Sequence, residues 1–373
     1  MFQFIFAGFL ATLLAYLSYK NKKDSYLVFA LVIMWYIAAF QDCIASDFNA
    51  YKEWFDKIRQ GRMGFSLIRT DRDNVEVGWY ILNKTIGYFS SSFYAVSAIV
   101  YLFVFSVFYR LLKQCPSKWR WMAVFYLYFT HGWFTSIMSA ERQTLAIAFW
   151  ILLFFSLREK KYIKSMILAV LGYSFHNSFL YSIPFLLLML IPFDRINFVK
   201  FRWGWLLTLI AIFLAVILSI QSIQVELSLL FADLNEDVTN STDIYNRYVE
   251  EITNADLAQK TTTIISRLIS FIFVVLALLS NNKRNTEYNL FFVYLLLSLI
   301  LMGAFGSFGS FARIFRYPLF LSLPAISYTA QNLNKEMRLL FILYTVFITM
   351  YSLISAFHTE QFVNYLDYHT IFF

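Results

Sequence analysis

Arginine is the residue type in this chain whose placement points most directly to chemistry. Arg142 follows Glu141 at the head of the apolar run SAERQTLAIAFW, and Arg267, Arg313 and Arg316 stand at or near the ends of other apolar segments. Charged side chains in membrane segments face a protein interior or a water-filled cavity. The planar guanidinium binds phosphate through paired, charge-assisted hydrogen bonds. These arginines predict a pocket for a phosphate or pyrophosphate group, with Arg313 and Arg316 on one helical face.

Each arginine also has a purely structural interpretation. Arg142 would then snorkel to the membrane interface or form an ion pair with Glu141. Arg313 and Arg316 would contact lipid phosphates of the outer leaflet, and Arg267 would pair with the acidic loop that precedes it. The pocket is the favoured interpretation for Arg142, because this residue begins an apolar helix. A charge in such a helix is costly and usually marks a functional site.

Two acids and one histidine are predicted at the same depth as these arginines. Asp47 and Glu76 flank the first outer loop, and His176 lies at a helix end in GYSFHNSF. We therefore expect one outward-facing pocket, rich in arginine, with a few acids and a histidine. The spacings typical of metal sites, P-loops and dinucleotide folds are missing from the sequence, so neither a metal nor a cofactor is predicted.

The composition places these residues in a membrane. The chain has 373 residues, of which 60% are hydrophobic and 14% charged, against about 25% charged in a typical soluble domain. We predict a single all-α polytopic membrane domain over residues 1–373. Cys43 and Cys115 would lie on opposite sides of the membrane and are predicted to be unpaired.

A helix needs roughly 20 apolar residues to cross the bilayer core. About twelve segments of the chain are predicted to do so. The predicted spans are 2–19, 25–45, 93–111, 121–138, 142–157, 163–177, 178–193, 204–223, 263–280, 288–306, 312–330 and 338–357.

The basic residues set the orientation of these spans. Short loops rich in Lys and Arg stay cytoplasmic, and six such loops face one side if residues 74–90 do not span. That segment carries Asn83 and Lys84 mid-way and has helically spaced apolar residues, as in an interfacial amphipathic helix. Residues 46–92 and 224–262 then form long outer loops. The net charge of +8 is accounted for by topology, and no nucleic-acid partner is expected.

Five stretches, taken in order, resemble the EpsG-like family of Wzy-type bacterial polysaccharide polymerases. The stretches are SDFNAYKEWFDKI (46–58), VEVGWYILNK (75–84), ERQTLAIAFWILL (141–153), YSFHNSFLYSIP (173–184) and FARIFRYPLF (311–320). The chain departs from the family pattern before Asp47. Ser46 stands where the family often has glycine, and Gln41-Asp42 where it often has arginine.

The resemblance implies a glycosyltransferase of the bacterial inner membrane with its site facing the periplasm. The growing glycan would pass from undecaprenyl pyrophosphate to the non-reducing end of a lipid-linked repeat unit. Such a reaction needs cations for the leaving pyrophosphate and a base for the acceptor hydroxyl. Asp47 is the first choice of base, with Glu76 and His176 as rivals. Membrane lipid and a chain-length regulator are the other expected partners.

Two other functions share part of this pattern. A flippase or transporter for a lipid-linked glycan also needs a cationic pocket, but its charges should lie near the membrane midplane. A membrane acyltransferase that modifies surface glycan would favour a histidine and an acid facing the cytoplasm, whereas His176 is predicted outside.

Overall fold

In the computed structural model, the chain forms two compact units. The first unit comprises 1–183, 323–331 and 338–373, and the second comprises 184–322 and 332–337. The structure describes residues 2–42, 47–66, 74–130, 133–190, 209–210, 213, 272, 286–305 and 313–357. The predicted spans 204–223 and 263–280 and the second outer loop, 224–262, lie outside the described residues apart from isolated positions.

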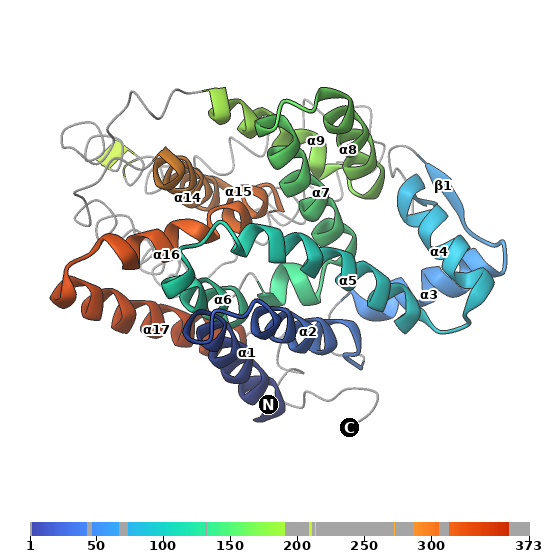
Figure 1. Cartoon of the computed structure of the whole chain (residues 1–373). Helices are drawn as coiled ribbons and strands as arrows, with labels where there is room; N and C mark the ends of the chain where they lie inside the picture. The colour runs from blue at the N-terminus through green and yellow to red at the C-terminus, as the bar shows by residue number, and fades with distance from the viewer. Residues whose placement is uncertain are drawn as a thin grey trace, which may run out of the picture. The chain divides into compact units, whose positions relative to one another are not determined.

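The first unit is a bundle of helices joined by short turns (Figure 1). Helix α1 packs against α2 and α6, α5 packs against α2 and α7, and α7 packs against α8. The bounds are α1 Phe2–Lys20, α2 Ser25–Ala39, α5 Phe93–Leu112, η1 Ser117–Trp119, α6 Arg120–Phe129, η2 Trp133–Met138, α7 Glu141–Arg158, α8 Tyr162–Phe175, α9 Ser178–Ser182, α16 Leu323–Asn332 and α17 Lys335–Phe357.

The second unit holds the remaining described elements. Helix α14 (Thr286–Phe305) packs against the short helix α15 (Arg316–Leu321). The 3-10 segment η3 (Ile183–Leu190) begins at the boundary between the units. The Tyr294 hydroxyl of α14 donates to the Phe185 carbonyl of η3 at 3.1 Å, which links these two elements.

Helix α1 shows the side-chain distribution of a membrane helix. Its buried face is mostly small, and Ala7, Gly8, Ala11 and Ala15 let the neighbouring helices approach closely. Apart from the buried Phe4, several of its large apolar residues point outward, as at Phe6, which is 56% exposed. An exposed apolar face of this kind indicates contact with lipid or a partner.

Two described helices, α1 and α5, are long and apolar enough to cross a bilayer on their own. Shorter apolar helices occur at Ser25–Ala39, Tyr162–Phe175, Ser178–Leu190 and Glu287–Leu301. The all-α class is confirmed for the described residues, apart from one small sheet. The count of about twelve crossings stays a prediction.

Three predicted spans are interrupted. The run 121–138 divides into α6 and the π-helix η2, and the run 178–193 divides into α9 and η3. The run 312–330 divides into α15 and α16 at Ser322. Short interruptions mark these breaks, at Thr130-His131-Gly132, near Pro184 and at Ser322, but each run as a whole is apolar enough to be predicted as one span. The π-helix matters for the site, since π turns often occur where side chains are repositioned for function.

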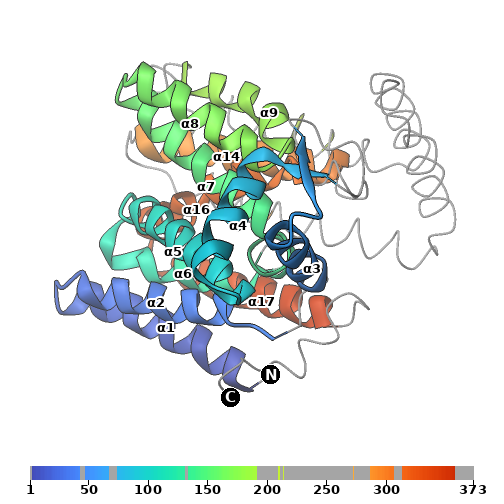
Figure 2. The same cartoon turned by 90° about the vertical axis from the view of Figure 1, so that its right-hand side faces the viewer.

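The first outer loop folds onto the start of α5 as two helices and a pair of strands (Figure 2). Helix α3 (Phe48–Arg59) and helix α4 (Val77–Phe89) pack together, and strands β1 (Gly64–Ser66) and β2 (Asn74–Glu76) pair in parallel. The strands were not predicted. With 12 and 13 residues, the helices extend only about 20 Å, which is short of a bilayer core of roughly 30 Å.

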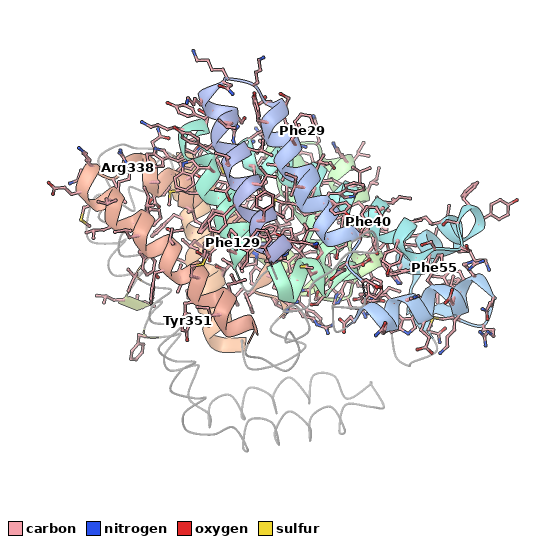
Figure 3. All side chains as sticks on the ribbon, turned by 90° about the horizontal axis from the view of Figure 1, so that it is seen from below. Phe29, Phe40, Phe55, Phe129, Arg338 and Tyr351 are labelled. Carbon is pink, nitrogen blue, oxygen red and sulfur yellow. The ribbon has the colours of Figure 1, made fainter. Side chains whose placement is uncertain are left out.

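Helix α3 is amphipathic, as its sequence period requires. Phe48, Tyr51, Phe55 and Ile58 are buried, and Phe55, labelled in Figure 3, packs against Phe93 at the start of α5 with ring centroids 6.0 Å apart. The predicted helix at 74–90 is confirmed as α4, which begins three residues later than expected because 74–76 form a strand. The position of both helices in the membrane interface remains a prediction.

Gly78 allows α4 to lie directly on α8. A Cβ at this position would come within 2.8 Å of the Ser174 carbonyl oxygen. The close approach matters because Gly78 is two residues after Glu76, and Ser174 is two residues before His176. The Glu-x-Gly sequence therefore brings the start of α4 to the end of α8, with Glu76 and His176 at the same junction.

Alanine at this position tests the packing. We expect Gly78→Ala to lower the free energy of unfolding by about 1–3 kcal/mol, because the methyl group must displace the Ser174 backbone. Thermal unfolding in detergent, followed by tryptophan fluorescence, measures the change.

The matched control is Gly87→Ala on the same helix. There a new Cβ meets only the side chains of Arg59 and Phe55, which can move. The gain in helix propensity of about 1 kcal/mol should leave stability unchanged or raised. Equal melting temperatures for the two variants would contradict the proposed role of the α4–α8 contact.

Candidate functional site

Arg142 is a buried cation at the start of α7. It is 5% exposed, and its Nη1 donates to Oε2 of Glu76, which is 4% exposed and ends strand β2. The pair joins residues 66 positions apart in the sequence. Burying both charges is tolerated only because they pair, since removing one partner from such a pair typically costs about 3–5 kcal/mol. The ion pair ties α7 to the first outer loop.

Two aromatic rings of α3 cover the guanidinium. The Arg142 Cζ lies 4.9 Å from the centroid of Trp54 and 5.5 Å from that of Tyr51. The Tyr51 hydroxyl is also close enough for a side-chain hydrogen bond to Arg142. Cation–π contacts strengthen when the cation is desolvated. Trp54, Tyr51 and Glu76 therefore hold the guanidinium in a fixed orientation, and we call these residues with Arg142 the arginine box.

Asp47 lies on the same side of α3 as the two rings. Asp47, Tyr51 and Trp54 are spaced i, i+4 and i+7, which places them on one helical face. Asp47 is the N-cap residue of α3, half-buried, and its side chain makes no capping hydrogen bond. That Asp47 shares a site with Arg142 and Glu76 stays a prediction.

Glu141 points away from the arginine box. It is 1% exposed, and Oγ of Ser97 on α5 donates to its Oε1 at 2.8 Å. The alternative in which Arg142 pairs with Glu141 is therefore wrong, because consecutive residues on a helix project in different directions. Glu141 instead links α7 to α5 through this hydrogen bond.

His176 ends α8 and is 8% exposed. The backbone N–H of Ser178 donates to its Nδ1 at 3.1 Å, and the Ser178 hydroxyl lies 2.8 Å from the same atom. Because Nδ1 accepts the backbone N–H, a neutral ring carries its proton on Nε2. This tautomer offers a hydrogen-bond donor, which suits contact with a phosphate oxygen better than removal of a proton.

The end of α2 contributes polar groups that the sequence reasoning did not select. The Tyr94 hydroxyl donates to Asp42 Oδ1 at 2.8 Å, and Gln41 Nε2 donates to the Met138 carbonyl at 2.8 Å. Tyr94 also contacts Phe48, the residue after Asp47, with ring centroids 5.6 Å apart. Asp42 is thus a second carboxylate near the start of α3. In the sequence, Asp42 stands out only as an acid near the end of an apolar run.

That the other predicted arginines share a site with Arg142 stays a prediction. Arg313 and Arg316 belong to the second unit and are both half-buried. Helix α15 begins at Arg316, and Arg313 lies in the turn before it, so the expectation that both lie on one helix is wrong. Arg267 lies outside the described residues.

Cys115 is free and buried, as predicted, and burial raises the pKa of its thiol to about 12. Cys43 lies outside the described residues. No group of three or more His, Cys, Asp or Glu side chains gathers within the described part of the chain in a way that would hold a metal ion.

The chain matches one protein family. A family model described as the EpsG family matches residues 24–369, nearly the whole chain, which confirms the resemblance found in the sequence. Neither a curated protein nor a solved structure gives a match. The family and the apolar helices together identify a membrane protein with a polymerase-type role in polysaccharide biosynthesis.

The arginine box predicts a strong energetic coupling between two distant residues. Glu76→Gln and Arg142→Gln should each lower the free energy of unfolding by about 3–5 kcal/mol, because each leaves a buried charge without its partner. The double variant should lose clearly less than the sum of the two. Thermal unfolding in detergent supplies all four values.

The control is the exposed ion pair of α3, Lys57 with Glu53, whose nitrogen and oxygen are 2.7 Å apart. Glu53→Gln should cost less than about 1 kcal/mol, as exposed pairs do. If Glu76→Gln proved no more damaging than Glu53→Gln, the buried ion pair would not hold the loop to α7.

Proposed function

The chain belongs to the EpsG family of Wzy-like polysaccharide polymerases, and on that premise we propose that it transfers a growing glycan from undecaprenyl pyrophosphate to the non-reducing end of a lipid-linked repeat unit. The reaction takes place at the outer face of the bacterial inner membrane, facing the periplasm. The observation that carries the proposal is Arg142, a buried guanidinium held by two aromatic rings and the carboxylate of Glu76.

The pyrophosphate replaces Glu76 as the partner of Arg142. Both are anionic oxygen acceptors, but pyrophosphate carries more charge and more acceptor oxygens than one carboxylate. The Nε of Arg142 is buried and makes no hydrogen bond within the described residues. A ligand that engages Nε together with Nη2, the nitrogen on the same edge, would form the paired geometry that guanidinium favours. The arginine box is thus suited to a ligand with two or more adjacent oxygens.

The transfer step is a substitution at the anomeric carbon of the donor sugar. The acceptor hydroxyl oxygen forms the new bond to that carbon, and the bond from the carbon to the pyrophosphate oxygen breaks. The electron pair leaves with the lipid pyrophosphate, whose charge Arg142 stabilises. Asp47 takes the proton of the hydroxyl. His176, with its proton on Nε2, donates a hydrogen bond to a phosphate oxygen.

The remaining arginines extend this arrangement. Arg313, Arg316 and Arg267 are proposed as further contacts to the pyrophosphate, and neither a metal nor a cofactor is needed if they share its charge. Glu76 stays a rival for the base, since ligand binding would release its carboxylate from Arg142. A chain-length regulator is a proposed partner, together with membrane lipid.

Polymer length in cells tests the roles of Arg142 and Asp47. Cells that lack the gene receive either variant, and surface glycan is separated on gels with membrane expression measured in parallel. Arg142→Lys should shorten or abolish the polymer, because lysine cannot form the paired contact, and losing one preorganised donor typically costs about 10²–10³ in rate. Asp47→Asn should lower the rate by about 10²–10⁴.

Asp56→Asn is the matched control for Asp47, since it makes the same change on the same helix at a position whose carboxylate lies 3.9 Å from Arg59. It should leave long polymer. Normal polymer from Asp47→Asn at normal expression would remove Asp47 from the mechanism and leave Glu76 as the base.

The two roles of His176 predict opposite results for one substitution. Glutamine keeps an N–H donor near the position of Nε2 but cannot act as a base. If His176 binds phosphate, His176→Gln should keep markedly more polymerisation than His176→Ala. Equal loss in both variants at equal expression would favour a proton-transfer role.

A polymerase also differs from a flippase in what accumulates. Cells with Arg142→Lys should display single repeat units on their surface, because export precedes polymerisation. Surface glycan missing altogether, with single units retained inside, would support a flippase instead.

A further inference from the structure

A polar pocket lies far from the arginine box, at the opposite end of α5. Its volume is about 440 Å³, and it is lined by Pro116, Ser117, Lys118, Trp119, Gln331 and Arg338. We call it the Trp119 pocket. The first turn of α5 carries Tyr94, beside the site, and the last residue is Leu112, just before the pocket. A helix of this length spans about 30 Å, so the pocket is separate from the site described above.

Two cations flank the indole in this pocket. The Lys118 Nζ lies 5.8 Å and the Arg338 Cζ 5.0 Å from the centroid of Trp119, both within cation–π range. The lining residues include no acid. The pocket therefore presents two positive charges on an aromatic surface, which favours an anionic ligand with an apolar part.

The walls of the pocket are fixed by hydrogen bonds between elements. Arg338 Nε donates to the Ala330 carbonyl at 2.7 Å, which ties α17 to the end of α16. Ser327 Oγ on α16 donates to the Trp119 carbonyl at 3.0 Å. The pocket is thus held between η1, α16 and α17 by contacts that do not depend on a ligand.

An apolar stripe leads from the pocket along α17. Directly after Arg338, which Figure 3 labels at the start of that helix, the residues Leu339, Leu343 and Phe347 are 58%, 57% and 58% exposed. Their i, i+4, i+8 spacing places them on one face. Eight residues of helix extend about 12 Å, close to half of the roughly 30 Å hydrocarbon core. The stripe is therefore about as long as one leaflet is deep.

The charge pattern assigns the leaflet. Lys118 and Arg338 belong to two of the six short basic loops, 109–120 and 334–338, that are predicted to be cytoplasmic. Basic pockets between membrane helices on that side suit anionic head groups. We propose that the Trp119 pocket binds the phosphate of an anionic glycerophospholipid of the inner leaflet, with one acyl chain along Leu339, Leu343 and Phe347. A free phosphate would use the cations but not the stripe.

Native mass spectrometry of the purified full-length protein tests this site. Delipidated protein receives phosphatidylglycerol, phosphatidylcholine with the same acyl chains, or glycerol phosphate as the head group without chains. The wild type should retain phosphatidylglycerol in clear preference to phosphatidylcholine. The double variant Lys118→Ala/Arg338→Gln should lose roughly 30-fold in affinity for phosphatidylglycerol, as expected for two charges near an anionic head group.

Two further variants keep the test independent of folding. Lys164→Ala removes an exposed lysine from another predicted cytoplasmic loop and should bind phosphatidylglycerol like the wild type. Lys118→Ala alone removes an exposed side chain that is not a structural cap, and it should lose roughly fivefold. Equal retention by Lys118→Ala, the double variant and Lys164→Ala would overturn the proposal.

The acyl stripe separates a lipid from a free anion. Leu343→Asn should weaken retention of phosphatidylglycerol, because an amide is placed against the acyl chain. If glycerol phosphate competed as well as the intact lipid, or if Leu343→Asn bound like the wild type, the pocket would be an anion site and the lipid proposal would be wrong.

Discussion

The structure of the site depends on one constraint, which is that a guanidinium buried at the head of an apolar helix must have a partner. Arg142 finds it in Glu76, at the end of a strand in the first outer loop. That requirement holds the loop against the helix bundle. Because the carboxylate comes from outside the bundle, the pair ties the folded loop to α7. The ion pair is therefore a structural tie, and it is also the anion-binding element that we propose.

This dual role explains why the pair suits a transferase. A buried ion pair contributes little net stability compared with well-packed apolar residues. A role in binding therefore explains this pair better than a contribution to stability does. An arginine already oriented by Tyr51 and Trp54 loses little side-chain freedom when it binds a phosphate. In the proposed mechanism, the carboxylate of Glu76 holds the cation in place until the pyrophosphate binds. Glu141 is not proposed for such an exchange, because it accepts a hydrogen bond from Ser97 of α5 instead.

Much of the helical framework could be predicted from the sequence, since long apolar runs without proline predict helices such as α1, α5 and α7. That Glu76 and Arg142 belong to one site could be anticipated from their common depth once the basic loops were assigned to one side, whereas the places of Asp47 and His176 in it stay predictions. The pairing of Glu76 with Arg142 could not, because both Glu141 and Glu76 were within plausible reach and no local pattern chooses between them. The rings of Tyr51 and Trp54 were hidden among the many aromatic residues of the chain, although their spacing from Asp47 is helical. The breaks after Phe129 and at Ser322 coincide with short polar interruptions that a search for long apolar runs passes over.

The most direct test of the account is the affinity of the purified protein for undecaprenyl pyrophosphate in two single variants. Arg142→Gln should bind it at least tenfold more weakly, since the paired contact is lost. Glu76→Gln should bind it more tightly than the wild type, because the carboxylate that competes for the guanidinium is gone, while Arg59→Gln on α3 should change nothing. Weaker binding in both Glu76→Gln and Arg142→Gln would show that the pair only supports the fold, and it would contradict the exchange of Glu76 for pyrophosphate.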